Sequence, residues 1–324
     1  MTQIKCPNCA GQIKVPPQSS TVVCPYCSTT VFAKTGTILK ENYVMRLQYG
    51  LEDARDKMLS WAMKQLGAPK GLENAEVKES KIIFWPFWVV EVEAKVNYSG
   101  IQKKPDFKGH DTQKRLNWNT VSESGTIDVE RDIFIPANQD TPAPLKNYII
   151  PTRRKEYFNM DKIIEVQGIT MSVQIDQKVA IDKAREIMEE YVQEEAMKEV
   201  DQINEIKRDL QTPAVFLVSV PIWHIKYSHN VRKYEGLVDG ASGRVVYLKF
   251  PRKIAFRAMT LFGGLLHLGV GGGIGLLLVY LGLTAFDGIY PTAFGISFGL
   301  GMLAISLIFF RTALSLRAGM EETR

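Results

Sequence analysis

Four cysteines near the start of the chain have the spacing of metal ligands. Cys6 and Cys9 form one Cys-Pro-x-Cys pair, Cys24 and Cys27 form a second, and residues 10–23 separate the two pairs. Four thiolates in two such pairs suit the tetrahedral coordination of Zn²⁺. Because protein atoms then fill all four coordination positions, no position is left for a catalytic water. The spacing therefore predicts a structural zinc site.

Two alternatives for these cysteines are a disulfide pair and a redox-active Cys-x-x-Cys motif. The redox motif favours a strand-to-helix context that this proline-rich segment lacks. A segment this short buries little apolar surface, so the ion would supply most of its folding free energy. We predict a zinc ribbon over residues 1–36, in which residues 13–15 and 21–23 pair as a hairpin around a turn at residues 16–20.

A second candidate site combines basic and aromatic side chains in the middle of the chain. Such a loop can bind phosphates, lipid headgroups or a protein partner. A solvated insertion explains the same charges equally well. Arg153, Arg154 and Lys155 form a further small basic cluster with the same two interpretations. The possible partner-binding residues of the loop are Phe107, Trp118, Lys103, Lys104, Lys108, Lys114 and Arg115.

The remaining side chains show no catalytic pattern. The four histidines have neither a neighbouring nucleophile nor metal-ligand spacing, and no Gly-x-x-x-x-Gly-Lys-Ser/Thr loop for nucleotide phosphates occurs. The formal net charge of +5 is modest for 324 residues, and Lys5, Lys14 and Lys34 give the ribbon a thin basic footprint. We therefore predict a binding protein that is not an enzyme, with nucleic acid as a less favoured partner.

The segment after the ribbon predicts an α+β body. A helical period from Asn42 to Leu66 precedes an alternating strand that begins around Trp85-Pro86-Phe87-Trp88. The same order recurs, with a helix from about Asp176 to Leu210 before Val220-Pro221-Ile222-Trp223. We predict an internal duplication of a helix plus antiparallel sheet. Its parts are a first repeat at residues 42–137 with the basic insertion, a connection at 138–175 and a second repeat at 176–250.

The matched segments lead to two expectations about side chains. Ala54-Arg55-Asp56 in the first helix is aligned with Ala184-Arg185-Glu186 in the second. Proline cannot donate a ladder hydrogen bond, so each Pro-x-Trp segment is expected at a sheet edge or a bulge. Trp88 and Trp223 are expected to fill the interface between sheet and helix, in preference to forming an aromatic binding surface.

The C-terminal region is apolar enough for two membrane spans. Residues 258–285 carry no charge apart from a titratable His267, and residues 289–310 carry none. Each stretch exceeds the roughly 20 residues that cross a bilayer. We predict transmembrane helices at 254–286 and 289–311, followed by a cytosolic tail at 312–324. Small residues should pack the two helices together, namely Gly269, Gly273, Gly295 and Gly299.

Charges that flank the two spans predict the orientation. Lys249, Lys253 and Arg257 lie before the first span and Arg311 follows the second, whereas the connection carries only Asp287. The excess of basic residues on the cytosolic side then places both termini in the cytosol. A conduction path lined by glycines and the histidine is the alternative, but two spans alone do not readily enclose a pore. Membrane anchoring is the favoured role.

The whole arrangement resembles a loosely defined group of bacterial and archaeal zinc-ribbon proteins. The resemblance covers residues 1–247 and rests on the two cysteine pairs, the Pro-x-Trp strands, Ile133-Phe134-Ile135-Pro136-Ala137 and the helix around Ala184-Arg185. We predict an adaptor that docks a protein partner at the cytosolic membrane face. The alternatives are a membrane-tethered nucleic-acid-binding protein and an accessory subunit of a transporter or channel.

Overall fold

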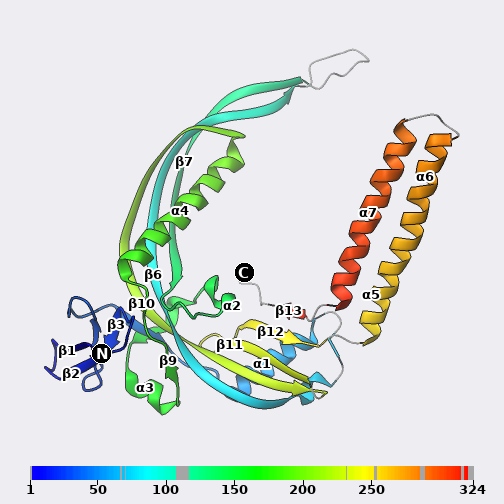
Figure 1. The fold of residues 1–324 in the computed structure, drawn as a ribbon. Coiled ribbons are helices and arrows are strands. Elements are labelled where there is room, and N and C mark those ends of the chain that lie inside the picture. Colours follow the sequence, from blue (N-terminus) through cyan, green and yellow to red (C-terminus); the bar gives the residue numbers. More distant parts are fainter. Residues whose placement is uncertain are drawn as a thin grey trace.

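The computed structural model describes residues 2–65, 68–69, 71–106, 117–230, 232–251, 254–284, 289–314 and 317–319. Figure 1 shows three parts, which are a small N-terminal unit of short strands, a long curved sheet with helices packed on it, and a pair of C-terminal helices. The curved sheet has nine strands, most of them antiparallel. Fold class is therefore mixed, with an antiparallel sheet body, as the sequence predicts.

The N-terminal unit consists of two separate hairpins. Strand β1 (Thr2–Lys5) pairs with β2 (Gln12–Val15), and β3 (Thr21–Val23) pairs with β4 (Thr30–Phe32). The predicted pairing of residues 13–15 with 21–23 is therefore wrong. Each cysteine pair instead lies in the turn of its own hairpin, because a Cys-Pro-x-Cys turn reverses the chain and brings the two strands beside it into register.

The body contains nine strands and several helices. The strands are β5 (Asn42–Met45), β6 (Glu76–Asp106), β7 (Asn117–Pro136), β8 (Lys155–Tyr157), β9 (Ile169–Thr170), β10 (Gln202–His229), β11 (Arg232–Asp239), β12 (Val245–Phe250) and β13 (Arg317–Gly319). The α-helices are α1 (Leu51–Met63), α2 (Ala143–Lys146), α3 (Met160–Glu165) and α4 (Gln177–Glu199), with 3₁₀ turns η1 (Leu72–Asn74) and η2 (Thr152–Arg154).

Strands β6, β7 and β10 extend together as a curved arm, with α4 along it (Figure 1). Alternate residues of β6 from Trp88 to Val96 are buried and pack against Ala184 and Met188 of α4, whereas Lys95 and Asn97 are exposed. This period of two is the predicted half-buried antiparallel strand. Trp88 is fully buried and Trp223 is half-buried, which confirms that the two tryptophans belong mainly to the core.

The sequence predicted Pro86 and Pro221 at a sheet edge or a bulge, and both predictions are wrong. Strands β6 and β10 are the central pair, with Pro86 opposite Ser219. The carbonyl oxygen of Pro86 accepts from Ala137 just after β7 ends, and that of Pro221 accepts from Gly240 just after β11 ends. The backbone nitrogen of each proline faces the same side as its carbonyl, where one neighbouring strand stops. Each proline therefore faces the point where the neighbouring strand ends, so a missing N–H costs little there. The carbonyl oxygens of Ala137 and Gly240 accept hydrogen bonds from residues outside the strands instead.

Two predicted helices are shorter than expected. Residues 42–45 form β5, which pairs in parallel with β10, and α1 begins only at Leu51. The second helix ends at Glu199, and β10 begins at Gln202. Residues 202–211 pair with β6 instead of continuing the helix, since β6 offers a ladder of backbone hydrogen bonds that the local sequence does not reveal.

Helix starts are tied to the sheet by a repeated set of hydrogen bonds. Trp88 Nε1 donates to the Ile175 carbonyl oxygen (2.8 Å), one residue before the N-cap of α4. Trp223 Nε1 donates to the Tyr49 carbonyl oxygen (2.9 Å), one residue before the N-cap of α1. The N–H groups of Gln174 and Ile175 both donate to the Ala137 carbonyl oxygen, and those of Gln48 and Tyr49 both donate to that of Gly240. Each helix is thus held by the long strand that follows the other helix.

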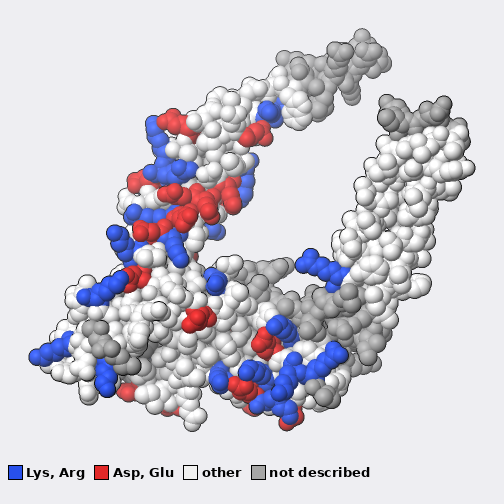
Figure 2. Space-filling model, viewed as in Figure 1, with Lys and Arg blue, Asp and Glu red and all other residues white. Residues whose placement is uncertain are grey.

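The C-terminal helices are α5 (Ile254–Leu266), which continues through a π turn η3 (His267–Gly271) into α6 (Gly272–Thr284), and α7 (Ile289–Leu314). Residues 258–284 and 292–312 are long and apolar enough to span a membrane, and both segments are mostly exposed, unlike the core helix of a soluble protein. Figure 2 shows almost no charged side chain on this hairpin.

Glycines bring α6 and α7 together, but through a different first-helix residue from those predicted. A Cβ atom at Gly275 would lie 3.0 Å from the Cα of Gly299 and 3.1 Å from the carbonyl oxygen of Gly295. No described atom lies within 4 Å of the corresponding positions at Gly269 and Gly273. The predicted Gly295 and Gly299 therefore pack at the interface opposite Gly275, and Gly269 and Gly273 do not.

Candidate metal centre

The four cysteine sulfurs converge at the point where the two N-terminal hairpin turns meet. All four Sγ atoms lie within 4.8 Å of one another. The sulfurs approach across the two turns, with 3.7 Å between Cys6 and Cys27 and 3.6 Å between Cys9 and Cys24. Cys6 and Cys24 are buried and Cys9 is exposed. Four thiolates at these separations can surround one tetrahedral Zn²⁺.

The two cysteine turns have the same backbone geometry. In the first, the Ala10 N–H donates to the Cys6 carbonyl oxygen (3.0 Å) and the Cys6 N–H donates to that of Gly11 (2.8 Å). The second turn repeats both bonds, at 2.9 Å each, between Ser28, Cys24 and Thr29. Ala10 has a φ of 62° and Ser28 a φ of 57°, a left-handed conformation that costs non-glycine residues energy. The repeated strain indicates that sulfur placement determines both turns.

Ionisation of the thiols depends on the neighbouring groups. Hydrogen bonds from the Thr29 hydroxyl and backbone N–H lower the pKa of the Cys27 thiol to about 6. At Cys9 the Gly11 N–H favours the thiolate, but the Cys27 sulfur, burial and the Cys24 and Cys6 sulfurs outweigh it and raise the pKa to about 12. Four thiolates therefore cannot form together unless a cation compensates their charge. A bound divalent ion would supply that compensation.

Hydrogen bonds and an ion pair dock the cysteine unit onto the body. The backbone N–H of Ser20 donates to the Val173 carbonyl oxygen (2.6 Å), and its hydroxyl bonds the same oxygen and that of Ile175. Lys34 forms an ion pair with Asp176, the N-cap of α4. Ser20 and Lys34 flank the β3–β4 hairpin, whose turn carries Cys24 and Cys27. The cysteine unit is therefore attached to the body through its second hairpin.

The basic-aromatic loop is described only in part. Lys104 forms an ion pair with Glu123 across β6 and β7 (2.8 Å), and the Lys103 N–H donates to Asp201. Trp118 is 56% exposed towards the end of the arm. The predicted residues Phe107, Lys108, Lys114 and Arg115 lie outside the described residues. The described members are therefore brought to the same end of the arm.

A carboxylate cluster that the sequence did not reveal lies on the arm. Glu91, Glu93 and Glu130 come together because Glu93 lies opposite Glu130 in the β6–β7 register. Burial and the Glu130 carboxylate raise the pKa of Glu91. The signal that could have found this cluster is the register of two strands far apart in the sequence. Acidic groups on an accessible strand surface are common, and the cluster by itself defines no site.

His224 is a half-buried histidine with a structural partner. Trp85 Nε1 donates to its Nε2 atom (3.0 Å). Burial lowers the pKa of His224 to about 4, so the ring is neutral near pH 7 and accepts this bond. The Trp85 ring also lies beside this imidazole, with 6.0 Å between the ring centres, and a hydrogen bond from a tryptophan gives no route to catalysis. His224 therefore contributes to the core.

No protein-family model, curated protein or solved structure matches the chain. The resemblance to bacterial and archaeal zinc-ribbon proteins stays a prediction. The geometry alone supports a four-cysteine metal centre, and sulfur ligands in this arrangement suit zinc. The four sulfurs would fill the first coordination sphere of such an ion, which suits a structural role.

Proposed function

We propose that the chain is a membrane-anchored adaptor whose N-terminal cysteine unit binds one structural Zn²⁺ and docks a protein partner at the cytosolic membrane face. The observation that carries the proposal is the closed set of four sulfurs in a unit that is fixed to the body by its second hairpin. A metal site with four protein ligands stabilises the fold of the unit and leaves no coordination position for catalysis. The surface of the stabilised unit can then bind a partner.

Tyr26 is the best candidate for a partner contact on this unit. The residue lies between Cys24 and Cys27, and 71% of its surface is exposed. Its ring covers Gly11 of the first turn, since a Cβ atom there would lie 2.4 Å from the ring. Exposed tyrosines on a rigid support are frequent energetic centres of protein interfaces. The metal would fix this ring by fixing both turns.

Nucleic-acid binding by the unit is less well supported. Of the three lysines that could contact phosphates, Lys34 is paired with Asp176 of the body. Lys5 and Lys14 remain, and two charges provide little of the phosphate neutralisation on which such binding depends.

Anchoring by the hairpin is supported by His267. Its ring stacks on Phe309, and its Nδ1 atom bonds the Gly263 carbonyl oxygen, so this nitrogen is used in packing.

The body is further proposed to derive from an internal duplication. The supporting observation is the repeated set of helix-start hydrogen bonds, which aligns the N-caps Gly50 and Asp176. Buried Ala54 of α1 then corresponds to buried Ala180 of α4. This alignment differs by one helical turn from the one based on sequence, which matched Ala54 with Ala184. The alignment from the structure places the buried faces of the two helices in the same position.

Photo-crosslinking tests the docking function. A photoreactive phenylalanine analogue at Tyr26 should crosslink to one discrete protein in cells, whereas the analogue at Tyr157, which is also 71% exposed, should not. The crosslink should disappear when Cys24→Ser and Cys27→Ser are added, while the chain still fractionates with membranes. A crosslink that survives demonstrated loss of zinc would move the docking surface elsewhere. Turnover of a small substrate by the purified chain would refute a purely adaptor role.

A further inference from the structure

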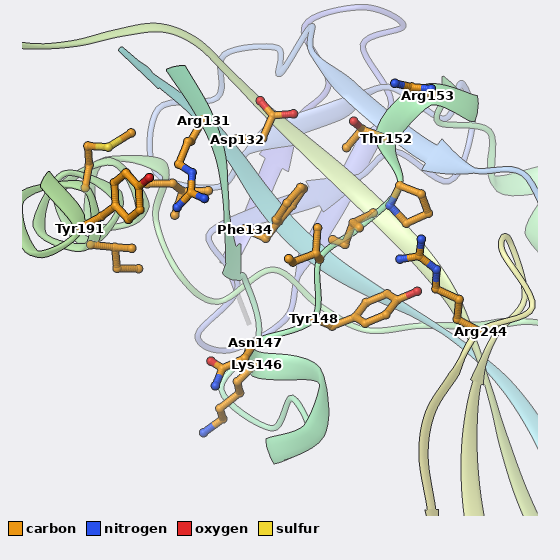
Figure 3. A pocket seen from close by; sticks show the side chains of 16 residues that line it. Arg131, Asp132, Phe134, Lys146, Asn147, Tyr148, Thr152, Arg153, Tyr191 and Arg244 are labelled. Carbon is orange, nitrogen blue, oxygen red and sulfur yellow. The ribbon is translucent and has the colours of Figure 1, made fainter. Parts of the chain in front are cut away.

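A cavity of about 860 Å³ lies on the body, away from the cysteine turns and the hairpin. It is lined by β7, by α4, by the segment from Lys146 to Arg153 and by Arg244 in the turn between β11 and β12. Figure 3 shows Phe134 in the middle, Arg131 beside Tyr191 on one side, and Arg153 and Arg244 on the other. The cavity therefore collects side chains that are far apart in the sequence.

Positive charge predominates around this cavity. Arg131, Lys146, Arg153 and Arg244 line it, and Asp132 is the acidic residue among the lining side chains. Within the described part of the chain, no carboxylate forms an ion pair with any of the four cations. Cations gathered in a concave surface raise the local positive potential and attract anions. Each of the four cations therefore remains without an ion-pair partner among the described residues.

The nearest buried carboxylate is committed to other partners. Asp239 is fully buried, accepts from the Tyr148 hydroxyl (2.6 Å) and accepts from the Ala241 N–H (2.8 Å). It also accepts from the Ser242 hydroxyl. These bonds satisfy its charge without Arg244. The guanidinium of Arg244 lies at the wall of the cavity that Tyr148 also lines, where a ligand can reach it.

Arg153 and Arg131 reach the cavity from different elements. Arg153 lies among the residues that line the cavity, whereas its neighbour Arg154 donates a hydrogen bond to Gln48 (2.5 Å). The Arg131 guanidinium carbon lies 3.9 Å from the centre of the Tyr191 ring, a cation–π contact that orients the group without neutralising it. Guanidinium groups bind phosphate oxygens through two parallel hydrogen bonds. An arginine at the wall of this cavity is therefore a suitable ligand for a phosphate group.

The floor of the same cavity is apolar. Ile133, Phe134 and Ile150 line it beneath the cations, and Ile149 (53% exposed) and Ile187 (45% exposed) flank it. A simple inorganic anion would leave this surface in water, whereas a ligand with an apolar part would cover it. The chemistry of the cavity is therefore that of an amphiphile with an anionic head.

We infer that this cavity binds a phosphate-bearing amphiphile, with the phosphate on Arg153 and Arg244 and the apolar part on Phe134 and Ile149. An anionic phospholipid of the anchoring membrane carries both a phosphate and an apolar part, and it is the source that we assign to the ligand. The choice of source rests on the membrane anchorage proposed above, whereas the phosphate chemistry does not.

Titration of the full-length chain in a neutral detergent tests the site. The probes are dihexanoyl phosphatidic acid, which is water-soluble, dihexanoyl phosphatidylcholine and inorganic phosphate, each followed by calorimetry. Phosphatidic acid should bind at least tenfold more tightly than either of the other two. The Arg153→Gln/Arg244→Gln variant should lose at least tenfold in affinity for it, and Ile149→Ser should lose a smaller factor. Arg185→Gln/Lys178→Gln removes the same charge from the exposed face of α4 and should change nothing.

Several outcomes would overturn the inference. Phosphatidylcholine carries a phosphate whose charge its choline group offsets, so equal binding of it would show that the site does not select a net negative head. An unchanged affinity of the Arg153→Gln/Arg244→Gln variant would show that the two arginines contribute nothing, and equal binding of inorganic phosphate would show that the apolar floor contributes nothing. The same loss in the Arg185→Gln/Lys178→Gln variant would reduce the effect to general charge. The lipid probe is soluble, so its binding does not depend on membrane anchorage. Membrane fractionation of the chain tests the anchorage separately, and a failed binding experiment is therefore distinguishable from a failed anchorage.

Discussion

The folding of the N-terminal unit depends on its four cysteine ligands. We expect one zinc per chain, and we expect Cys24→Ser with Cys27→Ser to release it and unfold residues 2–32, because two remaining thiolates cannot supply the folding free energy of a closed site. Elemental analysis with hydrogen exchange measures both effects. Helix α7 should exchange as in the native chain, since a helix satisfies its own backbone groups. Protected amides at residues 12–15 in a zinc-free chain would contradict the expectation.

His224 gives the body a defined pH dependence. Its folded pKa of about 4 lies below the ordinary value of 6.5, so the unfolded chain binds a proton that the folded chain excludes. The stability due to the neutral ring is complete above about pH 6.5 and is lost as the pH falls towards 4. Between pH 7 and pH 5 the native protein should lose about 1–2 kcal/mol more than His224→Gln, which keeps an acceptor for Trp85. Urea titrations at the two pH values measure this difference.

The control for this effect is His229→Gln, at the end of β10. Release of zinc at acidic pH is common to all three proteins and cancels in the comparison. Equal pH dependence of the native chain and His224→Gln would show that the imidazole is not held neutral. The control variant is expected to follow the native chain throughout.

Tryptophan anchors operate between elements. Trp88→Phe removes the bond to the Ile175 carbonyl and Trp223→Phe removes the bond to the Tyr49 carbonyl. Each should reduce the free energy of unfolding by about 1–3 kcal/mol, because the carbonyl oxygen loses the indole N–H and a small cavity forms. Hydrogen exchange should rise at the start of α4 in Trp88→Phe and at the start of α1 in Trp223→Phe. Increased exchange only in the helix preceding the mutated strand would contradict the reciprocal arrangement.

Packing of α6 on α7 depends on which face each glycine occupies. Gly275→Leu would place a side chain against the backbone of Gly295 and Gly299, whereas Gly273→Leu meets open space. The two substitutions change helix propensity and hydropathy equally, so they are matched controls. We expect faster hydrogen exchange across residues 272–284 in detergent for Gly275→Leu alone. The same exchange in both variants would place the helix interface elsewhere.

Local patterns predicted some elements and missed others for physical reasons. The alternation from Val90 to Val96 and the spacing of the cysteines depend on neighbouring residues, and both predictions match the structure. The end of α4 and the gaps beside Pro86 and Pro221 depend on pairing with distant strands, which leaves no local signal. Of the arginine-lined cavity, the sequence revealed only the basic cluster that contains Arg153. Arg131 and Arg244 are far from Arg153 in the sequence, and only the pairing of the strands brings the three residues to one cavity.

The arm and the hairpin constrain each other at the scale of the whole molecule. Both extend in the same direction from the base of the sheet (Figure 1), and the arm carries charges of both signs along its length (Figure 2). A bilayer around the hairpin at this angle would also contain part of the arm and its charged side chains. Charged side chains in hydrocarbon cost several kcal/mol each. A hairpin in a bilayer therefore has to make a larger angle with the arm, which leaves the arm in water.

Topology follows from the distribution of charge at the two ends of the hairpin. Basic residues flank its outer ends, and the connection carries only Asp287, which lies outside the described residues. From the positive-inside rule we predict that the body and both termini lie in the cytosol and the connection on the far side. A membrane-impermeant thiol reagent applied to intact cells should label Asp287→Cys and leave Thr120→Cys, on the arm, unlabelled. Thr120→Cys should become reactive once the membrane is permeabilised, which confirms that the residue is accessible. Labelling of Thr120→Cys in intact cells, with Asp287→Cys protected, would invert the orientation and place the cysteine unit outside the reducing cytosol, where free thiolates are poorly maintained as zinc ligands.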